Sequence, residues 1–245
     1  MSGITPHNPL EGQAPEISIP LHQNTSEHVS IIVVHKDRPE YLNICLQSIA
    51  VTSYNNNYEI IVVDNKSGKE SQDFLDDIQK EVEIVRNDKN LYWSAACNKG
   101  VQRASKKSKY LIFMHSDVVI TNPAWIDVLI NVSQSKNSGF VGVDTNKYKM
   151  GGNDVEFIQE YLCMMTRECW NDCGPCPEQL PLVGSSFIMT LRAQNRGHSP
   201  QVMKNPICHH YKIFGVDINE WERITEQAVA AIPKLLSDVN SRSIK

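Results

Sequence analysis

Four short runs of mostly apolar, β-branched residues recur along the first half of the chain, with more polar segments between them. The runs occupy residues 29–34, 58–64, 82–86 and 110–114. Runs of this length and composition are typical of strands that are buried on both faces of a sheet. The intervening segments carry apolar residues at helical spacing and predict helices that begin at Pro39, near Ser71 and at Ser94. This alternation predicts right-handed βαβ units and a parallel sheet.

The pattern is weaker in the second half of the chain. It predicts a helix at residues 125–132 and strands at residues 140–143 and 183–191. Residues 144–181 are rich in cysteine, glycine and proline, which favours irregular structure. A final amphipathic helix is expected to begin near Asp217, and Pro233 is expected to kink it.

Composition places the chain among globular proteins and bears on its location. Hydrophobic residues make up 41% and charged residues 21% of the sequence, which is ordinary for a globular domain. The net charge of −4 comes with no basic stripe, which argues against nucleic acid as a partner. Residues 1–28 are polar and proline-rich, so we expect a flexible tail without a secretion signal. Because no transmembrane segment is evident either, we expect a cytoplasmic protein, or one that is peripheral to a membrane.

Polar residues follow each of the four predicted strands. They are His35 and Asp37, then Asp64 and Asn65, then Arg86 and Asn87, and finally His115, Ser116 and Asp117. The carboxyl ends of parallel strands lie along one edge of a sheet, where α/β proteins bind their ligands. The sequence therefore predicts one ligand site along this edge.

Four segments within residues 29–132 carry recognisable motifs in a fixed order. They read VSIIVVHKDRPEYLNICLQSI, EIIVVDNKSG, EIVRNDKNLYWSAACNKGVQRA and KYLIFMHSD. Together they resemble the nucleotide-binding half of the inverting GT-A glycosyltransferases of family 2. The resemblance implies one α/β GT-A domain over residues 29–245, with a mostly parallel sheet flanked by helices. Residues 133–245 would form the acceptor half. The implied reaction moves a hexosyl or deoxyhexosyl group, with inversion, from a nucleotide-diphosphate donor to a hydroxyl of a glycan or lipid-linked acceptor.

The same resemblance implies roles for residues at the strand ends. Asp64 would hydrogen-bond the nucleotide base, and Arg86 and Asn87 would line the pocket for base and ribose. The helix that carries Asn98 would pack beneath the ribose and diphosphate. The remaining strand-end residues expected to contact the nucleotide are His35, Asp37, Asn65, His115 and Ser116.

Asp117 occupies the position of the last acid in the family's metal motif. A leaving diphosphate needs positive charge, which Mn²⁺ or Mg²⁺ supplies as a Lewis acid. Such ions prefer oxygen ligands, although Mn²⁺ also accepts imidazole. The alternative is that Asp117 has only a structural role and caps the following turn. The chain departs from the family at the first acid of this motif, where His115 would bind metal or ribose, or would simply pack at the end of its strand.

Two further features bear on the metal and the sugar. Family members often carry a histidine near the C-terminus that reaches back to the metal, which makes His209 or His210 a second candidate ligand; otherwise both lie on the surface. Tyr92 and Trp93 stand where the family often has glycine. These two aromatic residues would narrow the sugar pocket, stack on a base or belong to the core.

The catalytic base is less clearly marked. An inverting transfer needs a carboxylate that takes the proton of the acceptor hydroxyl. The family supplies it from an acidic pair after the segment matching VGSSFIMTLRA, yet no Asp or Glu lies between Arg192 and Cys208. Asp172 is the favoured replacement. The other candidates are Glu168, Asp154 and Asp217.

Four of the seven cysteines crowd into a short segment. They are Cys163, Cys169, Cys173 and Cys176. Four thiolates suit a structural Zn²⁺ ion, although this spacing is not a common finger pattern. The motif from Cys173 to Cys176 resembles the dithiol of thioredoxins, which would indicate redox chemistry. The plainest interpretation is a set of reduced cysteines in a helix and loop.

Other functions fit the sequence less well. The missing acidic pair and the histidine in the metal motif suit a non-catalytic sugar-nucleotide-binding protein or a degenerate partner subunit. A nucleotidyltransferase would need a glycine-rich loop after the first strand, where residues 35–39 contain no glycine. A dinucleotide-dependent oxidoreductase fails for the same reason, because no G-x-G-x-x-G motif follows any strand.

Overall fold

The computed structural model describes residues 27–53, 56–150, 152–203, 206–213 and 217–241. Apart from its last two residues, the predicted tail over residues 1–28 lies outside this part of the chain. A seven-stranded sheet forms the centre, in the order β10-β6-β9-β4-β1-β2-β3. Its strands are β1 (Val29–His35), β2 (Tyr58–Asp64), β3 (Glu83–Arg86), β4 (Tyr110–His115), β6 (Phe140–Gly142), β9 (Leu162–Thr166) and β10 (Gln201–Val202).

The sheet is mostly parallel, as predicted. Strand β1 pairs in parallel with β2 and β4, and β3 and β10 also pair in parallel with their neighbours. Only β9 runs antiparallel, between β4 and β6. The four strands predicted in the first half of the chain are β1 to β4, so this part of the prediction is confirmed, together with the α/β fold class.

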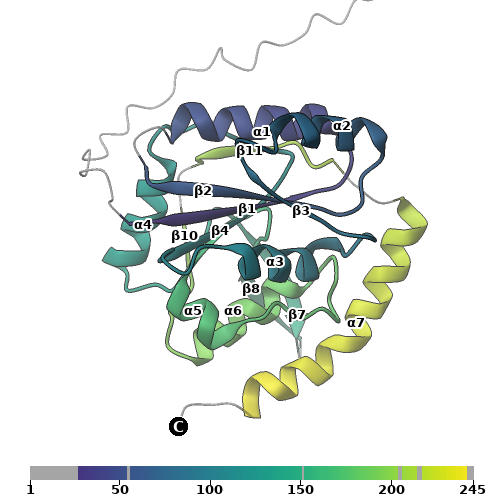
Figure 1. Cartoon of the computed structure of the whole chain (residues 1–245). Helices are drawn as coiled ribbons and strands as arrows, with labels where there is room; N and C mark the ends of the chain where they lie inside the picture. Colours follow the sequence, from purple (N-terminus) through teal and green to yellow (C-terminus); the bar gives the residue numbers. More distant parts are fainter. Residues whose placement is uncertain (1–26, 54–55, 151, 204–205, 214–216, 242–245) are drawn as a thin grey trace, which may run out of the picture.

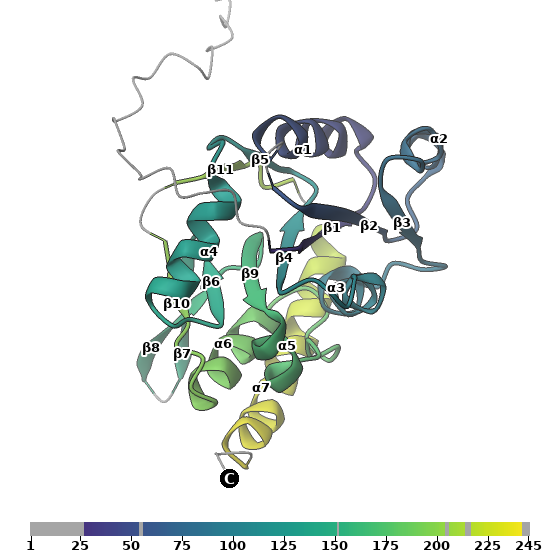
Figure 2. The ribbon, with the colours of Figure 1, turned by 60° about the vertical axis from the view of Figure 1, so that its left-hand side comes forward.

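Helices cover both faces of the sheet. They are α1 (Pro39–Thr52), α2 (Lys69–Ile78), α3 (Tyr92–Arg103), α4 (Trp125–Ser135), α5 (Arg167–Cys173), α6 (Ser185–Asn195) and α7 (Ile218–Ser241). Figures 1 and 2 show α1 and α2 on one face and α3, α5 and α6 on the other. Within the described residues, no helix is both long enough and apolar enough to cross a bilayer.

Alternate residues of β1 supply the two cores. Ile31 packs in the core that includes α1, α2 and α4, whereas Ile32 packs in the core that includes α3, α5 and α6. Helix α3 lies very close to the sheet, because a Cβ atom at Gly100 would sit 2.4 Å from Cγ2 of Ile32. A third apolar cluster joins α6 to α7 through residues such as Phe187 and Ile232.

Two small sheets complete the fold. Strand β5 (Val118–Ile120) follows β4 closely and pairs antiparallel with β11 (Cys208–His210). Strands β7 (Thr145–Met150) and β8 (Asn153–Ile158) form an antiparallel hairpin. The β5–β11 sheet lies directly after the carboxyl end of β4, at the edge where the ligand site was predicted.

The second half of the chain differs from the prediction in two places. The segment predicted as a strand at 183–191 is helix α6, and the prediction was wrong because this helix is buried on most of its surface. Its apolar residues therefore show no clear helical stripe. The segment 144–181, predicted to be irregular, contains β7, β8, β9 and α5. Pro233 lies inside α7, which continues to Ser241. The division of the domain into a nucleotide-binding half, residues 29–132, and an acceptor half, residues 133–245, stays a prediction.

Candidate functional site

A cavity of about 490 Å³ lies at the carboxyl ends of β1 and β4. Its walls come from those two strand ends, the start of α3, the β8–β9 connection, the start of α6, β11 and its following residues, and α7. Both predicted halves of the chain therefore contribute to one hollow. A site of this kind, at the carboxyl edge of a largely parallel sheet, is where α/β proteins bind ligands.

Three potential metal ligands converge on one point of this cavity. The Oδ1 atom of Asp117 lies 3.4 Å from Nε2 of His210 and 3.9 Å from Nδ1 of His115. The potential ligand atoms of all three residues lie within 4.8 Å of one another. The pairing of β11 with β5 sets His210 opposite Val118 and so returns it to the end of β4. Asp117, His115 and His210 can therefore hold one ion between them.

Neighbouring groups fix the orientation of these ligands. The backbone N–H of Ile213 donates to Oδ2 of Asp117 at 2.7 Å. The Trp93 ring meets the His115 ring edge to face, with centroids 4.5 Å apart. The Tyr161 ring stacks on the other imidazole, that of His210, at 4.4 Å and an angle of 16°. Little rearrangement is then needed for the three side chains to bind an ion.

The protonation states also suit metal binding. Burial lowers the pKa of His115 to about 4, so its imidazole is neutral at pH 7. Burial alone would raise the pKa of Asp117, but the hydrogen bond from His210, the nearby His115 and the Ile213 N–H together lower it. Neutral imidazole and ionised carboxylate are the forms that bind metal ions.

The donor set distinguishes between the two predicted ions. Mg²⁺ requires oxygen ligands, whereas two imidazoles and one carboxylate suit a transition metal such as Mn²⁺. Of the two candidate histidines near the C-terminus, His210 reaches the cavity. The side chain of His209 is exposed on the opposite side of β11, where it meets the Tyr211 ring at 4.7 Å.

Several predicted nucleotide contacts line the same cavity. They are His35, Asn65, His115 and Ser116. His35 is fully buried and bonds Ser116 Oγ at 3.2 Å through Nδ1. Burial lowers the pKa of His35 to about 4, so it stays neutral. Asn65 donates to the carbonyl oxygen of Tyr92 at 2.9 Å, which ties the end of β2 to the start of α3.

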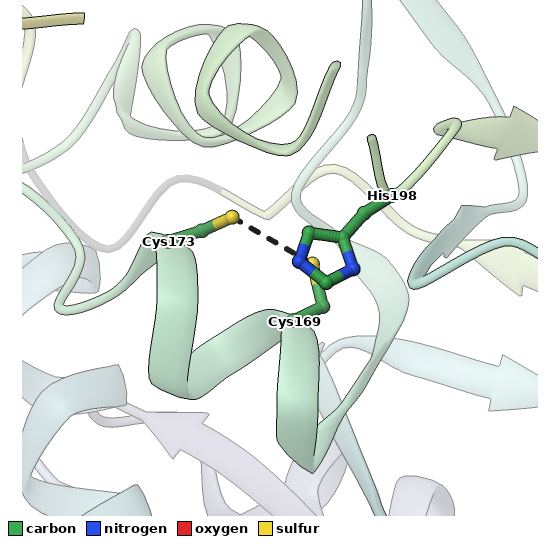
Figure 3. A group of neighbouring side chains, drawn as sticks. All are labelled: Cys169, Cys173 and His198. Carbon is green, nitrogen blue, oxygen red and sulfur yellow. Dashed lines mark hydrogen bonds between the residues drawn. The ribbon is translucent and has the colours of Figure 1, made fainter. Parts of the chain in front are cut away.

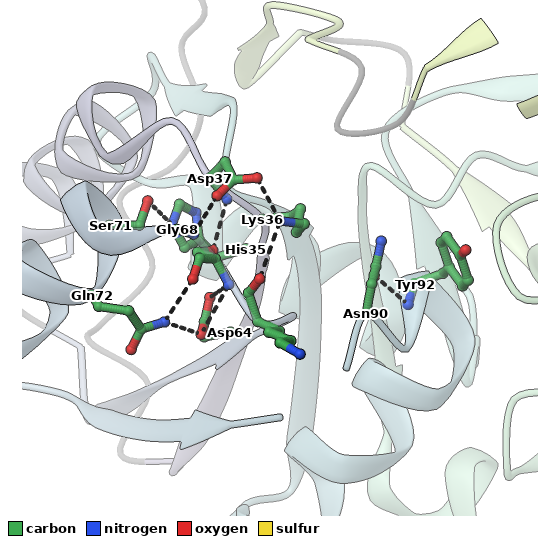
Figure 4. A network of polar contacts seen from close by, with 11 residues as sticks. His35, Lys36, Asp37, Asp64, Gly68, Ser71, Gln72, Asn90 and Tyr92 are labelled. Atoms are coloured by element: carbon green, nitrogen blue, oxygen red, sulfur yellow. Dashed lines mark hydrogen bonds and ion pairs between the residues drawn. The ribbon is translucent and has the colours of Figure 1, made fainter. Parts of the chain in front are cut away.

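Asp37 and Asp64 are engaged in a network beside the cavity rather than in its lining (Figure 4). The Asp64 carboxylate is buried and accepts hydrogen bonds from Ser67 N at 3.1 Å and Gln72 Nε2 at 2.6 Å. The Asp37 carboxylate accepts from Gly68 N at 2.6 Å. Both acids hold together the loops that follow β1 and β2. Direct contact of either with a nucleotide stays a prediction.

The other predicted nucleotide residues also lie outside the lining. Arg86 forms an ion pair with Asp76 of α2. Asn87 donates to Asn65 Oδ1 at 3.1 Å and so supports a lining residue. Asn98 points to residues 176–178, where it exchanges hydrogen bonds of 3.0 and 2.9 Å with the Cys176 backbone. That the helix carrying Asn98 packs beneath the ribose and diphosphate stays a prediction.

None of the predicted catalytic bases faces the cavity. Asp172 is half exposed on α5, where it pairs with His198 at 2.8 Å. Glu168, Asp154 and Asp217 are also absent from the lining. Asp172 is therefore misplaced for taking a proton from an acceptor bound in the cavity.

The cavity contains an acid that sequence reasoning missed. Glu160, in the connection between β8 and β9, lines the cavity and accepts a hydrogen bond from Ser186 N at 3.4 Å. Burial raises its pKa to about 7, against the hydrogen bonds from Ser186. No motif marks Glu160. It reaches the site only because the β7–β8 hairpin and β9 place it against the N-terminus of α6.

Three non-glycine residues of the lining have left-handed backbone conformations. The φ angles are 59° at Arg38, 57° at Tyr92 and 59° at Lys212. Each such residue costs roughly 1–3 kcal/mol, and such strain gathers at functional sites. The conformation of Tyr92 explains why glycine suits this position in the family that the sequence resembles. Tyr92 lines the cavity, whereas Trp93 is buried against His115.

The cysteine-rich segment does not form the predicted four-cysteine zinc site. Cys169 and Cys173 lie together with their Sγ atoms 3.9 Å apart. Cys163 and Cys176 instead lie near Cys97, whose pKa is raised by burial and by these two neighbours. Since Cys173 and Cys176 fall in separate groups, the thioredoxin-like dithiol is not formed either.

Comparison with known proteins agrees with this geometry. Residues 30–197 match the family model described as Glycosyl transferase family 2. The O-antigen biosynthesis protein RfbC of Myxococcus xanthus is 28% identical over 116 residues, which are 46% of this chain and 9% of that protein. The chain therefore spans a small part of this curated relative.

Solved structures share the fold. One is the mannosyltransferase PcManGT from Pyrobaculum calidifontis in complex with GDP-Man and Mn²⁺, with a TM-score of 0.63 and 12% identity over 82% of this chain and 61% of that one. Another is glucosyl-3-phosphoglycerate synthase from Mycobacterium tuberculosis in complex with Mn²⁺, UDP and phosphoglyceric acid, with a TM-score of 0.64 and 14% identity over 86% of this chain and 78% of that one. Both confirm the GT-A fold.

The positions of the two neighbouring histidines lead to a direct prediction. His210→Ala should abolish Mn²⁺ binding, because it removes an imidazole that faces Asp117, whereas the matched variant His209→Ala should bind Mn²⁺ as the wild type does. Electron paramagnetic resonance of free Mn²⁺ during a titration measures both. Equal loss in the two variants, or none in either, would contradict the assignment of His210.

Proposed function

The chain belongs to the glycosyl transferase family 2, and we propose that it transfers a sugar from a nucleotide-diphosphate donor to an acceptor hydroxyl in this cavity. The observation that carries the proposal is the convergence of His115, Asp117 and His210 at the carboxyl end of β4. The solved neighbours crystallised with Mn²⁺ and with GDP-Man or UDP support both the donor class and the metal.

The donor's diphosphate would lie where metal ligands and basic side chains meet. A bound Mn²⁺ would supply Lewis-acid charge to the departing diphosphate. Lys36, Arg38 and Lys212 line the same cavity. Within the described part of the chain, neither Arg38 nor Lys212 forms an ion pair. Their charges are therefore available to the phosphate oxygens.

Glu160 is the base of the proposed reaction. Its pKa of about 7 leaves a substantial ionised fraction at neutral pH, which suits a group that must accept a proton. The hydrogen bond from Ser186 N orients the carboxylate within the cavity. In the reaction, Glu160 takes the proton of the acceptor hydroxyl as its oxygen attacks the anomeric carbon, and the nucleotide diphosphate leaves from the opposite side. One such displacement inverts the anomeric configuration.

Aromatic side chains form the acceptor side of the cavity. Phe157, Tyr161 and Trp221 belong to its lining. The Tyr92 hydroxyl donates to Glu220, so α7 closes the cavity against the start of α3. Large apolar walls with a few convergent polar groups are typical of pockets for organic ligands. The similarity to an O-antigen biosynthesis protein supports a growing polysaccharide as the acceptor.

A non-catalytic role is less well supported. It was suggested by the lack of an acidic pair after α6 and by the histidine in the metal motif. Glu160 supplies an acid inside the cavity from another element, and His115 is one of three converging ligands. Both observations support the catalytic proposal over the non-catalytic one.

A donor screen tests the proposed function. The melting temperature of the wild type should rise with one of the UDP-, GDP-, dTDP- or CMP-sugars, and only when Mn²⁺ is present. Saturation at 100 times Kd stabilises a protein by about 2.7 kcal/mol, which shifts the melting temperature by roughly 5–10 °C for a domain of this size.

In the screen, Asp117→Asn should lose the shift, while the exposed control Asp154→Asn should keep it. Turnover of that donor with an acceptor then completes the test. A fully folded wild type that no nucleotide sugar stabilises would refute the proposal.

The pH dependence tests Glu160. Because the base must be deprotonated, kcat/KM should be constant above pH 7 and fall about tenfold per pH unit below it, given the raised pKa of about 7. Glu160→Gln should lower kcat by about 10²–10⁴-fold and remove this pH step, with donor binding retained. The control is Glu156→Gln, which alters an exposed acid of β8. A wild-type profile in Glu160→Gln would rule this base out.

A further inference from the structure

Two cysteines and a histidine form a compact cluster outside the cavity. Figure 3 shows Cys169 and Cys173 on α5, with the imidazole of His198 turned toward them. The two Sγ atoms lie 3.9 Å apart, and one imidazole nitrogen lies within 4.8 Å of both. None of these residues lines the cavity, so the cluster is separate from the proposed active site.

The distance between the sulfur atoms matches that between two ligands of one zinc ion. Zn–S bonds are about 2.3 Å long, and a tetrahedral angle between them places the sulfur atoms about 3.8 Å apart. The observed distance is 3.9 Å. Residues four apart lie on one face of a helix. Helix α5 therefore presents Cys169 and Cys173 to a common point without any change in its backbone.

The surrounding backbone holds the imidazole against the thiols. The N–H of His198 donates to Ala193 O at 2.9 Å, and its carbonyl accepts from Gly139 N at 2.7 Å. A Cβ at position 139 would lie 2.7 Å from both His198 Nδ1 and Cys169 Cβ. Glycine at this position thus allows the histidine and the cysteine to approach each other.

Polar groups surround the two thiols. The Cys169 thiol donates toward Cys173 Sγ at 3.9 Å. The positive charge of Arg196 lies close to Cys173, and the buried Nη1 of Arg196 has no hydrogen-bond partner among the residues described. Asp172 Oδ2 lies 2.8 Å from His198 Nε2, as carboxylates often do beside metal-bound histidines.

We propose that Cys169, Cys173 and His198 bind one structural zinc ion. Two thiolates neutralise the charge of the ion, and the thiol protons pass to solvent on binding. Thiolate and imidazole together select zinc over the harder ions suited to carboxylates. A water molecule completes the tetrahedral shell, while Asp172 holds the other ring nitrogen of His198. The ion joins α5 to the loop after α6, and so stiffens the acceptor half away from the cavity.

Cobalt substitution tests the site in the intact chain. Absorption from thiolate-to-cobalt charge transfer arises only when a cysteine sulfur binds the ion, so binding at His115, Asp117 and His210 does not contribute. Protein produced in cobalt-supplemented medium should show this absorption together with the strong visible bands of a tetrahedral ion. Cys173→Ser should abolish both. The matched control Cys176→Ser, which changes a cysteine of the other group, should retain them.

Zinc analysis provides the second measurement. Wild-type protein produced with zinc should contain one zinc ion per chain. The Cys173→Ser variant should lack this zinc, and the Cys176→Ser variant should retain it. Absence of thiolate-to-cobalt absorption in the folded wild type would overturn the proposal without reference to any variant. Absorption that survives in Cys173→Ser, or that disappears in Cys176→Ser, would equally overturn it, because other cysteines would then be the ligands.

Discussion

The antiparallel pairing of β11 with β5 is the constraint on which the site depends. It returns the chain to the end of β4, so that Ile213 donates to Asp117 across 96 positions of sequence. Because side chains alternate along a strand, this register also decides that His210 faces Asp117 while His209 faces away. The pairing thus positions the proposed metal ligands, the stacking of Tyr161 on His210 and one wall of the cavity.

The electrostatics of the cavity follow from burial and from a few neighbours. Burial keeps His115 and His35 neutral and brings the pKa of Glu160 to about 7. Asp117 remains ionised because hydrogen bonds outweigh its own burial. Neutral imidazoles, an ionised carboxylate and a carboxyl group with a raised pKa coexist within one cavity, since each meets a different environment at the end of a different element. The proposed metal-assisted displacement requires these different protonation states.

The sequence predicted the parts of the fold that are determined locally. Strands β1 and β4 are continuous apolar runs because both faces are buried, and Asp117 could be placed at the site because it lies two residues after the end of β4. Helix α6 was missed because burial on most of its surface hides its period. Glu160 was missed because its position depends on the pairing of β9 with β4 and β6, which no local pattern encodes. Asp172, chosen by proximity in sequence, instead supports His198.

The central claim is that donor and metal meet at Asp117 and His210. The most direct measurement is a crystal structure of the chain with Mn²⁺ and its nucleoside diphosphate, with anomalous diffraction collected at the manganese edge. We predict an anomalous peak bonded to Asp117 and His210, with the diphosphate on the same ion and Glu160 facing the vacant sugar position. A peak elsewhere in the chain, or a diphosphate bound outside the cavity, would contradict the account.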